Sequence, residues 1–277
     1  MKLLVFKSLW EWNGIWQGRL EQTAESGYAG VEYTPPADAK EDRTFRRALD
    51  EMNLQYIAQV VTRGPDHITS FREQVLRAAD LQPLLINSHS AADRMPAEEQ
   101  FRFFGEALRL EEQIGIPIAH ETHRGRAFFT PWQTAAVLRQ FPELKLGADF
   151  GHWCAVCERM PDAEDEDVHL CLQRSIHIHG RVGYPGGPQI SDPRAPEYQE
   201  YVNRFIDLWL TICRQRLAAG APIMTFTPEF GPAPYLQLLP FTGQPVTDLW
   251  AVNLWMFQTF EQRYREMLSE DVLVSQL

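Results

Sequence analysis

Long apolar runs, cysteine and positive charge are all scarce in this sequence of 277 residues. No segment reaches about 18 uninterrupted apolar residues, which predicts that no part of the chain spans a membrane. The first residues have neither the continuous apolar core nor the cleavage site of a signal peptide, so we expect a cytoplasmic protein. The 26 basic and 37 acidic residues give a net charge of −11, the wrong sign for gripping nucleic acid.

The four cysteines are too few to form a disulfide framework in a chain of this length. Two of them, Cys154 and Cys157, form a CxxC pair. Because the sequence has no second CxxC, the pair cannot belong to a four-thiolate zinc site. Structural thiols are the favoured interpretation, and a redox role is the alternative.

Short apolar runs rich in strand-forming residues alternate with longer amphipathic stretches along the whole chain. Successive runs begin about 25 to 35 residues apart until the last, longer interval, which is typical of repeated strand-helix units. Eight such strands close a barrel, so the sequence predicts a single (β/α)8 TIM barrel over residues 1–277, with no linker dividing it. The predicted strands are 3–6, 30–33, 55–60, 83–87, 117–121, 145–149, 175–179 and 222–227.

Between these strands, apolar residues recur at spacings of three to four, which indicates helices that bury one face. Thr130 and Pro131 are a typical helix start, with threonine as N-cap and proline at the first helical position. One connection, 180–196, is long and rich in proline and glycine, and we interpret it as a lid or rim loop. The predicted helices are 41–52, 68–81, 97–114, 131–139, 198–217 and 248–268.

Four of the predicted strands end on, or just before, a potential metal ligand. The segments are IAHE ending at Glu121, LGAD at Asp149, SIHIH at His179 and FTPE at Glu229. Because a barrel brings the carboxyl ends of its strands around one pocket, ligands far apart in sequence can converge on a single ion. Three carboxylates and one imidazole favour an oxygen-rich site for a divalent cation.

Further polar and aromatic residues are predicted to lie near the same strand ends. His177 alternates with His179 and points to the same side, as a deeper or substrate-contacting residue. Arg181 has the geometry to hold a hydroxyl, carboxylate or phosphate group, and His89 ends the fourth strand. Trp153 is placed to stack on a sugar face, with core packing as the alternative.

The motifs INSHS, HETHRGR, ADFGHW, HIHGRVGYPGGPQ and TPEFGPAPY together resemble the xylose isomerase-like TIM barrels. Within that superfamily the chain looks most like the bacterial sugar phosphate isomerase/epimerase group, and the resemblance spans essentially its whole length. In the ketose 3-epimerase branch a Glu-Asp-His-Glu quartet holds one divalent metal. Carried over by motif, the ligands are Glu121, Asp149, His179 and Glu229, and manganese is the expected ion, with magnesium, cobalt or zinc as alternatives.

The resemblance implies a carbohydrate isomerase or epimerase that removes a proton next to a carbonyl and passes through a metal-stabilised enediolate. Glu121 and Glu229 would be the acid/base pair, while His152 and Arg181 would position the substrate. The chain departs from the epimerases at Ala127, where many of them carry another carboxylate. HETHRGR supplies His123 and Arg124 instead, which points to a different or more anionic substrate.

Three other functions remain open from the sequence. A metal-dependent 3-keto-glycoside lyase or hydrolase would use the same proton abstraction, followed by elimination of the leaving sugar. An endonuclease IV-like nuclease would need further His and Asp ligands, and the acidic charge opposes DNA binding. A sugar-binding barrel without turnover would not need two strand-end glutamates. A homodimer is compatible with the long rim loop and with the aromatic residues that we expect to be exposed.

Overall fold

Eight parallel strands close into a barrel in the order in which they occur along the chain. The structure is a computed structural model and describes residues 1–12, 16–36 and 38–274. The first strand pairs with the last, with Leu3 opposite Met224, which closes the barrel and confirms the predicted fold. All eight predicted strands are present: β1 (Lys2–Ser8), β2 (Gly30–Tyr33), β3 (Gln55–Val61), β4 (Leu85–His89), β5 (Ile118–Glu121), β6 (Lys145–Ala148), β7 (Ser175–His179) and β8 (Ile223–Thr227).

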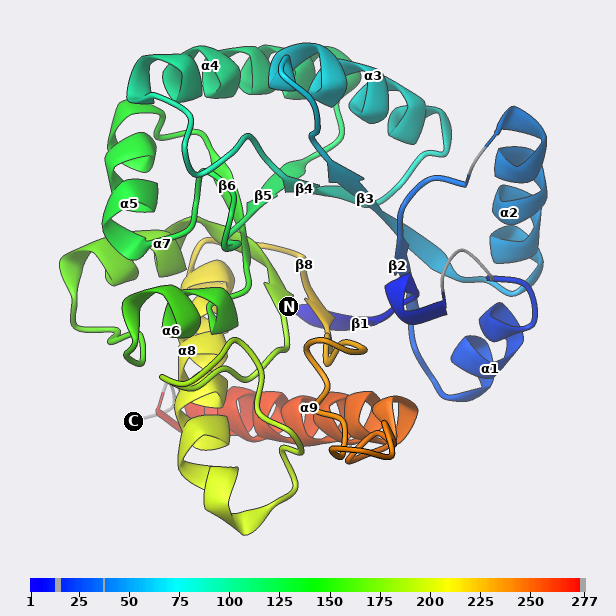
Figure 1. Cartoon of the computed structure of the whole chain (residues 1–277), viewed down its shortest axis with the longest axis vertical. Coiled ribbons are helices and arrows are strands. Elements are labelled where there is room, and N and C mark those ends of the chain that lie inside the picture. The colour runs from blue at the N-terminus through cyan, green and yellow to red at the C-terminus, as the bar shows by residue number, and fades with distance from the viewer. Residues whose placement is uncertain (13–15, 37, 275–277) are drawn as a thin grey trace.

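Helices surround the strands on the outside of the barrel (Figure 1). They are α1 (Arg19–Glu25), α2 (Ala39–Glu51), α3 (His67–Asp80), α4 (Ala97–Ile114), α5 (Pro131–Gln140), α6 (Gly151–Cys157), α7 (Glu166–Arg174), α8 (Gln199–Ala218) and α9 (Leu249–Val274), with short 3-10 helices η1 (Trp10–Trp12) and η2 (Pro196–Tyr198). The six predicted helices are confirmed. The ranges of α1, α6 and α7 were not predicted, because helices of seven to nine residues are too short for a clear helical period. No helix in the described ranges is long and apolar enough to cross a membrane.

The helix α5 begins with the N-cap and the proline that were predicted from the sequence. The Thr130 side-chain oxygen accepts a hydrogen bond of 3.3 Å from the backbone N–H of Gln133, and Pro131 occupies the first turn. The cap satisfies one of the backbone donors that a helix leaves unpaired at its first turn.

Two apolar clusters lie on the two sides of the barrel wall. The larger one fills the space between strands and helices, and the smaller one consists of Leu4, Phe6, Ile57, Leu85 and Ala119. Because side chains alternate along a strand, the residue two positions further on points to the same side as each member of the smaller cluster. From Ile57, Leu85 and Ala119, that step leads to three polar side chains: Gln59, Asn87 and Glu121. The interior of the barrel is therefore apolar toward the amino ends of the strands and polar toward their carboxyl ends.

Gly147 on β6 leaves room for one of these polar side chains. A Cβ atom at this position would lie 2.5 Å from Oδ1 of Asn87, whose amide is bonded to Glu121. We therefore expect Gly147→Ala to destabilise the protein by about 1–3 kcal/mol through overpacking.

Thermal unfolding of Gly147→Ala checks this expectation against a matched glycine in a helix. At Gly105 in α4 the nearest atom to an added Cβ is 3.9 Å away, so Gly105→Ala is expected to be neutral or stabilising. Equal melting temperatures for the two variants would show that Asn87 moves aside without cost.

Candidate metal centre

Four buried ligand groups converge at the carboxyl ends of consecutive strands. Glu121 and His179 end β5 and β7, Asp149 follows directly after β6, and Glu229 lies two residues beyond β8. One ligand atom from each of the four lies within 4.8 Å of the others, and all four residues are buried. The strands therefore bring together the quartet predicted from the sequence.

The quartet holds three carboxylates close together with little solvent. Nδ1 of His179 lies 2.6 Å from Oε2 of Glu229 and 3.6 Å from Oε2 of Glu121. Arg181 spans the other two, since its Nε donates to Asp149 and its Nη2 to Glu229, both at 2.8 Å. Burying carboxylates this close together costs free energy unless cations compensate their charge, so the site favours the binding of positive charge.

The pKa values of the three carboxyl groups move in different directions. Burial acts to raise the pKa of Glu121, but His89 and His179 outweigh it and hold the pKa below its ordinary value. Burial is likewise outweighed at Glu229, where His179 and Arg181 lower the pKa. At Asp149 burial prevails over Arg181 and, with the charges of Glu229 and Glu121, raises the pKa to about 7.

The donor set fits a divalent cation. Three carboxylates and one imidazole are ligands that magnesium, manganese and similar ions accept. Within the described residues, the buried Oε1 of Glu121 has no hydrogen-bond partner. A buried carboxylate oxygen without a donor is expensive, and a cation would satisfy it. The buried residues Glu121, Asp149, His179 and Glu229 are therefore candidate ligands of one ion.

Glu32 on β2 lies beneath the quartet and supports His179. Its Oε1 is 2.9 Å from Nε2 of His179, and its Oε2 is 3.2 Å from Nε2 of His177. Burial acts to raise the pKa of Glu32, but His179 and His177 outweigh it and hold the pKa well below its ordinary range. An ionised Glu32 accepts the Nε2 proton of His179, which leaves Nδ1 facing Glu121 and Glu229.

Glu32→Gln is therefore expected to weaken divalent-metal binding by about 10- to 100-fold, because the carboxylate that orients His179 is lost. Calorimetric titration of the metal-free protein with manganese measures the change. Glu25→Gln, on the exposed surface of α1, is the matched control and is expected to bind as the unmodified protein does. Unchanged affinity in Glu32→Gln would mean that other contacts suffice to fix the imidazole.

The predicted rim segment 180–196 is tied to its neighbours. Nη1 of Arg181 donates to Oε1 of Gln189 at 3.1 Å, and the same oxygen accepts from the backbone N–H of Gly231. The Arg181 guanidinium also lies over the Tyr235 ring, 4.5 Å from its centroid. Arg181 is thus engaged by protein groups on three sides and orients Asp149 and Glu229, which leaves little of its hydrogen-bonding capacity for a substrate.

Three histidines and an arginine from the predicted substrate set line one side of the quartet. The rings of His89 and His123 are 4.5 Å apart between centroids, and those of His123 and His152 are 3.8 Å apart. Neither nitrogen of the buried His152 has a hydrogen-bond partner among the described residues, although Nε2 lies 3.4 Å from Asp149 Oδ2. Arg124 packs on Tyr235 and forms no ion pair within the described part of the chain. These groups offer unused hydrogen-bonding capacity next to the ligands.

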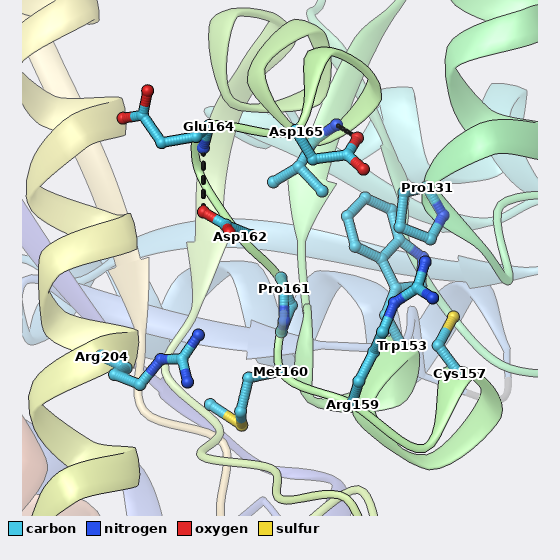
Figure 2. A pocket seen from close by; sticks show the side chains of 11 residues that line it. Pro131, Trp153, Cys157, Arg159, Met160, Pro161, Asp162, Glu164, Asp165 and Arg204 are labelled. Atoms are coloured by element: carbon cyan, nitrogen blue, oxygen red, sulfur yellow. Dashed lines mark hydrogen bonds between the residues drawn. The ribbon is translucent and has the colours of Figure 1, made fainter.

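Trp153 is the predicted substrate contact that the structure does not bring to this group. Its ring is buried, stacks on Phe150 at 4.6 Å between centroids, and donates a hydrogen bond to the backbone oxygen of Phe128. Trp153 also lines a separate hollow of about 500 Å³ beside α6 and α7, together with Cys157, Arg159 and Arg204 (Figure 2). The contacts of Trp153 are those of a packing residue.

The two thiols of the CxxC pair remain unbonded to each other. Cys154 is buried against Met160, 3.7 Å from its sulfur, and burial raises the pKa of its thiol to about 12. Burial also raises the pKa of Cys157. Thiols with raised pKa values form little nucleophilic thiolate at neutral pH, which agrees with a structural interpretation.

Three site residues were given no role from the sequence: Asn87, Gln189 and Glu32, of which Glu32 was noted only for its place near a predicted strand end. The Asn87 amide donates to Glu32 Oε1 at 3.0 Å and to Glu121 Oε2 at 2.7 Å, which links the two acids. Glu32 is not part of a charged sequence motif, and Gln189 lies in a loop whose conformation cannot be predicted from the sequence. Asn87 lies two residues before His89 on one strand and so points to the same side, which is the reasoning that selected His177 from its spacing to His179.

Comparison with known proteins agrees with the fold and shows the family. The model of the xylose isomerase-like TIM barrel family matches residues 20–187, more than half of the chain. No curated protein matches it. One similar solved structure is a D-tagatose 3-epimerase-like protein, with 14% identity over 98% of this chain and 100% of that one and a TM-score of 0.62. A second is the 3-keto-D-glucoside 4-epimerase YcjR from E. coli, with 12% identity over 94% of this chain and 100% of that one and a TM-score of 0.58. A third is a xylose isomerase-like TIM barrel protein from Mycobacterium smegmatis in complex with magnesium, with 14% identity over 94% of this chain and 97% of that one and a TM-score of 0.61.

At these identities the similar structures show the fold alone. The family match covers the segments that contain Glu121, Asp149 and His179. This chain belongs to the xylose isomerase-like TIM barrel family.

Proposed function

We propose that this protein is a divalent-metal-dependent isomerase or epimerase of carbohydrates that removes a proton from the carbon next to a carbonyl group. The observation that carries the proposal is the convergence of Glu121 and Glu229 with Asp149 and His179 within 4.8 Å. Two of the three carboxylates can act as acid and base only if they face the same small space. Two of the similar structures, a D-tagatose 3-epimerase-like protein and a 3-keto-D-glucoside 4-epimerase, support the reaction class.

A divalent cation held by the quartet would polarise the substrate carbonyl and so acidify the adjacent C–H bond. One of Glu121 and Glu229 takes that proton, because the lowered pKa values keep both groups ionised at neutral pH. For epimerisation the first glutamate passes its proton to solvent water, and the other glutamate takes a proton from solvent water and delivers it to the opposite face of the carbon. For aldose-ketose isomerisation the proton returns to the adjacent carbon.

The remaining residues of the site hold the reacting groups in place. Arg181 keeps Asp149 and Glu229 in position, and Asn87 does the same for Glu121. His152 and Arg124, which have unused donors or acceptors, are placed to bind hydroxyl or anionic groups of the substrate. An uncompensated arginine at this edge favours sugars that carry an acidic group.

The second candidate function is a lyase or hydrolase of 3-keto-glycosides. Its substrate class, a 3-keto-glucoside, is that of one of the similar structures, a 3-keto-D-glucoside 4-epimerase. The same base would remove the proton next to the keto group, but the leaving sugar would then be eliminated. The two reactions differ in their products, and one experiment separates them.

Incubation of the manganese-loaded protein with ketoses and 3-keto-glucosides in D2O tests both functions. An isomerase or epimerase incorporates deuterium next to the carbonyl of the recovered sugar, which proton NMR detects as a lost signal. A lyase or hydrolase releases the aglycone instead. Neither exchange nor release with neutral and acidic sugars would contradict the proposal. Cutting of an abasic plasmid would favour a nuclease.

A further inference from the structure

Three arginines that form no ion pair within the described residues gather on the carboxyl side of the barrel, beside the candidate metal centre. They are Arg63, Arg94 and Arg126, in the loops that follow β3, β4 and β5. We propose that these arginines bind a phosphate or carboxylate group that the sugar substrate carries at the end away from its reacting carbon. The inference rests on the proposed function for the sugar and extends it by a site for the acidic group.

Hydrogen bonds hold the three loops side by side. Nη1 of Arg126 donates to the backbone oxygen of Thr62 at 2.8 Å and to that of Ala91 at 3.3 Å. Thr62 directly precedes Arg63, and Ala91 lies three residues before Arg94. The side chain of Arg126 therefore bridges the two neighbouring loops that carry the other arginines.

The positive charges in these loops act on one another. Burial lowers the pKa of Arg126, and the charge of Arg63 lowers it further although Glu121 opposes the change. Burial also lowers the pKa of His67, and the charges of Arg126 and Arg94 act in the same direction. Such a positive cluster is exceptional in a chain with a net charge of −11, and it attracts anions to this side of the barrel.

The two carboxylates of the same loops already have other donors. Asp66 caps α3, since it accepts from the backbone N–H of Thr69 at 3.0 Å and from its hydroxyl at 2.7 Å. Asp93 accepts from the backbone N–H of Arg94 at 2.7 Å. Both carboxylates are exposed, where water and salt screen their charge. The guanidinium groups thus keep hydrogen-bond donors available for an added anion.

The arginines lie close to the groups proposed to react. Thr62, which accepts from Arg126, donates to the backbone oxygen of His89 through its N–H at 3.1 Å and its hydroxyl at 3.2 Å. Nε2 of His89 is 2.7 Å from Oε2 of Glu121. Neighbouring strands lie about 4.8 Å apart, so the ends of β3, β4 and β5 span roughly 10 Å. A hexose whose reacting carbon lies against Glu121 can therefore reach the arginines with its other end.

The chemistry of the cluster fits a single acidic group. Guanidinium groups bind phosphate and carboxylate oxygens through pairs of parallel hydrogen bonds, which makes arginine well suited to this task. A nucleic acid would offer phosphates too, but proteins that grip a duplex make about 6 to 10 phosphate contacts. Three arginines in an acidic chain are too few for that, whereas they are enough for one group on a small molecule.

Calorimetric titration of the manganese-loaded protein with D-fructose, D-fructose 6-phosphate and D-glucuronate tests the proposal. At least one of the two acidic sugars is expected to bind about 10- to 100-fold more tightly than neutral fructose. Combining Arg63→Ala with Arg94→Ala, both at exposed positions, is expected to remove most of this preference and to leave the affinity for fructose unchanged. Arg214→Ala, exposed near the end of α8, is the matched control and should keep the preference.

Equal affinities for the three sugars, or a preference that survives in the double variant, would overturn the site. A preference for one acidic sugar supports it and identifies the group as a phosphate or a carboxylate. Acidic sugars that bind through the arginines but undergo no deuterium exchange would contradict the proposed function and leave the anion site standing. Exchange in fructose without any preference for acidic sugars would remove the anion site alone. Tighter binding of duplex DNA through the same arginines would overturn the proposal in favour of a nucleic acid.

Discussion

Glu121→Gln and Glu229→Gln are each expected to abolish turnover while the barrel stays folded. Loss of one acid/base group alone lowers a rate by about 10²- to 10⁴-fold, and each residue is also a candidate ligand. Glutamine has the shape of glutamate, so the apolar clusters on both sides of the barrel wall are untouched. It also removes one of three carboxylates that lie within 4.8 Å of each other, which relieves repulsion in the metal-free protein.

Deuterium exchange and product formation measure the loss, and circular dichroism during heating reports the fold. Saturating manganese separates the two roles of each glutamate, because a variant that regains its metal but not its activity lacks an acid or base. Glu73→Gln, on the exposed side of α3, is the control and should keep full activity. Near-native turnover in either site variant would rule out the role given to that residue.

The barrel and the quartet could be predicted because both follow from local patterns. Each ligand lies at or just after the end of a short apolar strand, and strand ends are visible as changes from apolar to polar residues. Closure of the barrel then brings the ends of β5 to β8, and the ligands that they carry, close together. That step needs only the number and order of strands, not the conformation of any side chain.

The supporting residues could not be selected in the same way, because their roles depend on contacts across the barrel. Glu32 is 147 positions from His179 in sequence, and only the closed barrel brings the two to 2.9 Å. Arg181 was expected to hold substrate, but its direction toward Asp149 and Glu229 is set by a loop whose path is not periodic. Trp153 lies on α6, which begins three residues after the end of β6, and its buried ring stacks on Phe150.

Removal of the divalent cation is the second change with a large expected effect. We expect chelation to abolish turnover and to lower the melting temperature, since the buried carboxylates lose their compensating charge. A ligand at about 100 times its Kd stabilises a protein by about 2.7 kcal/mol, so the shift should grow with the manganese concentration. Activity that persists after complete removal of metal would contradict the proposed chemistry.

The affinity for this cation is expected to depend on pH in two regimes. Burial acts to lower the pKa of His179, but Glu229 and Glu32 outweigh it and hold the pKa well above its ordinary value, so the ion must displace a proton from this imidazole. Below pH 7 it must also displace one from Asp149, whose pKa burial raises to about 7. Affinity should therefore rise about 100-fold per pH unit below about pH 7 and about tenfold per unit above it.

Calorimetric titration in two buffers of different ionisation enthalpy counts the released protons directly. We expect about two protons per ion at pH 6 and about one at pH 8. Asp149→Asn, which weakens binding but cannot lose a proton, should release one at both values. The same count of two in Asp149→Asn would assign the second proton to another group. A single proton at every pH in the unmodified protein would mean that Asp149 is already ionised before the ion arrives, with Arg181 rather than burial controlling its charge.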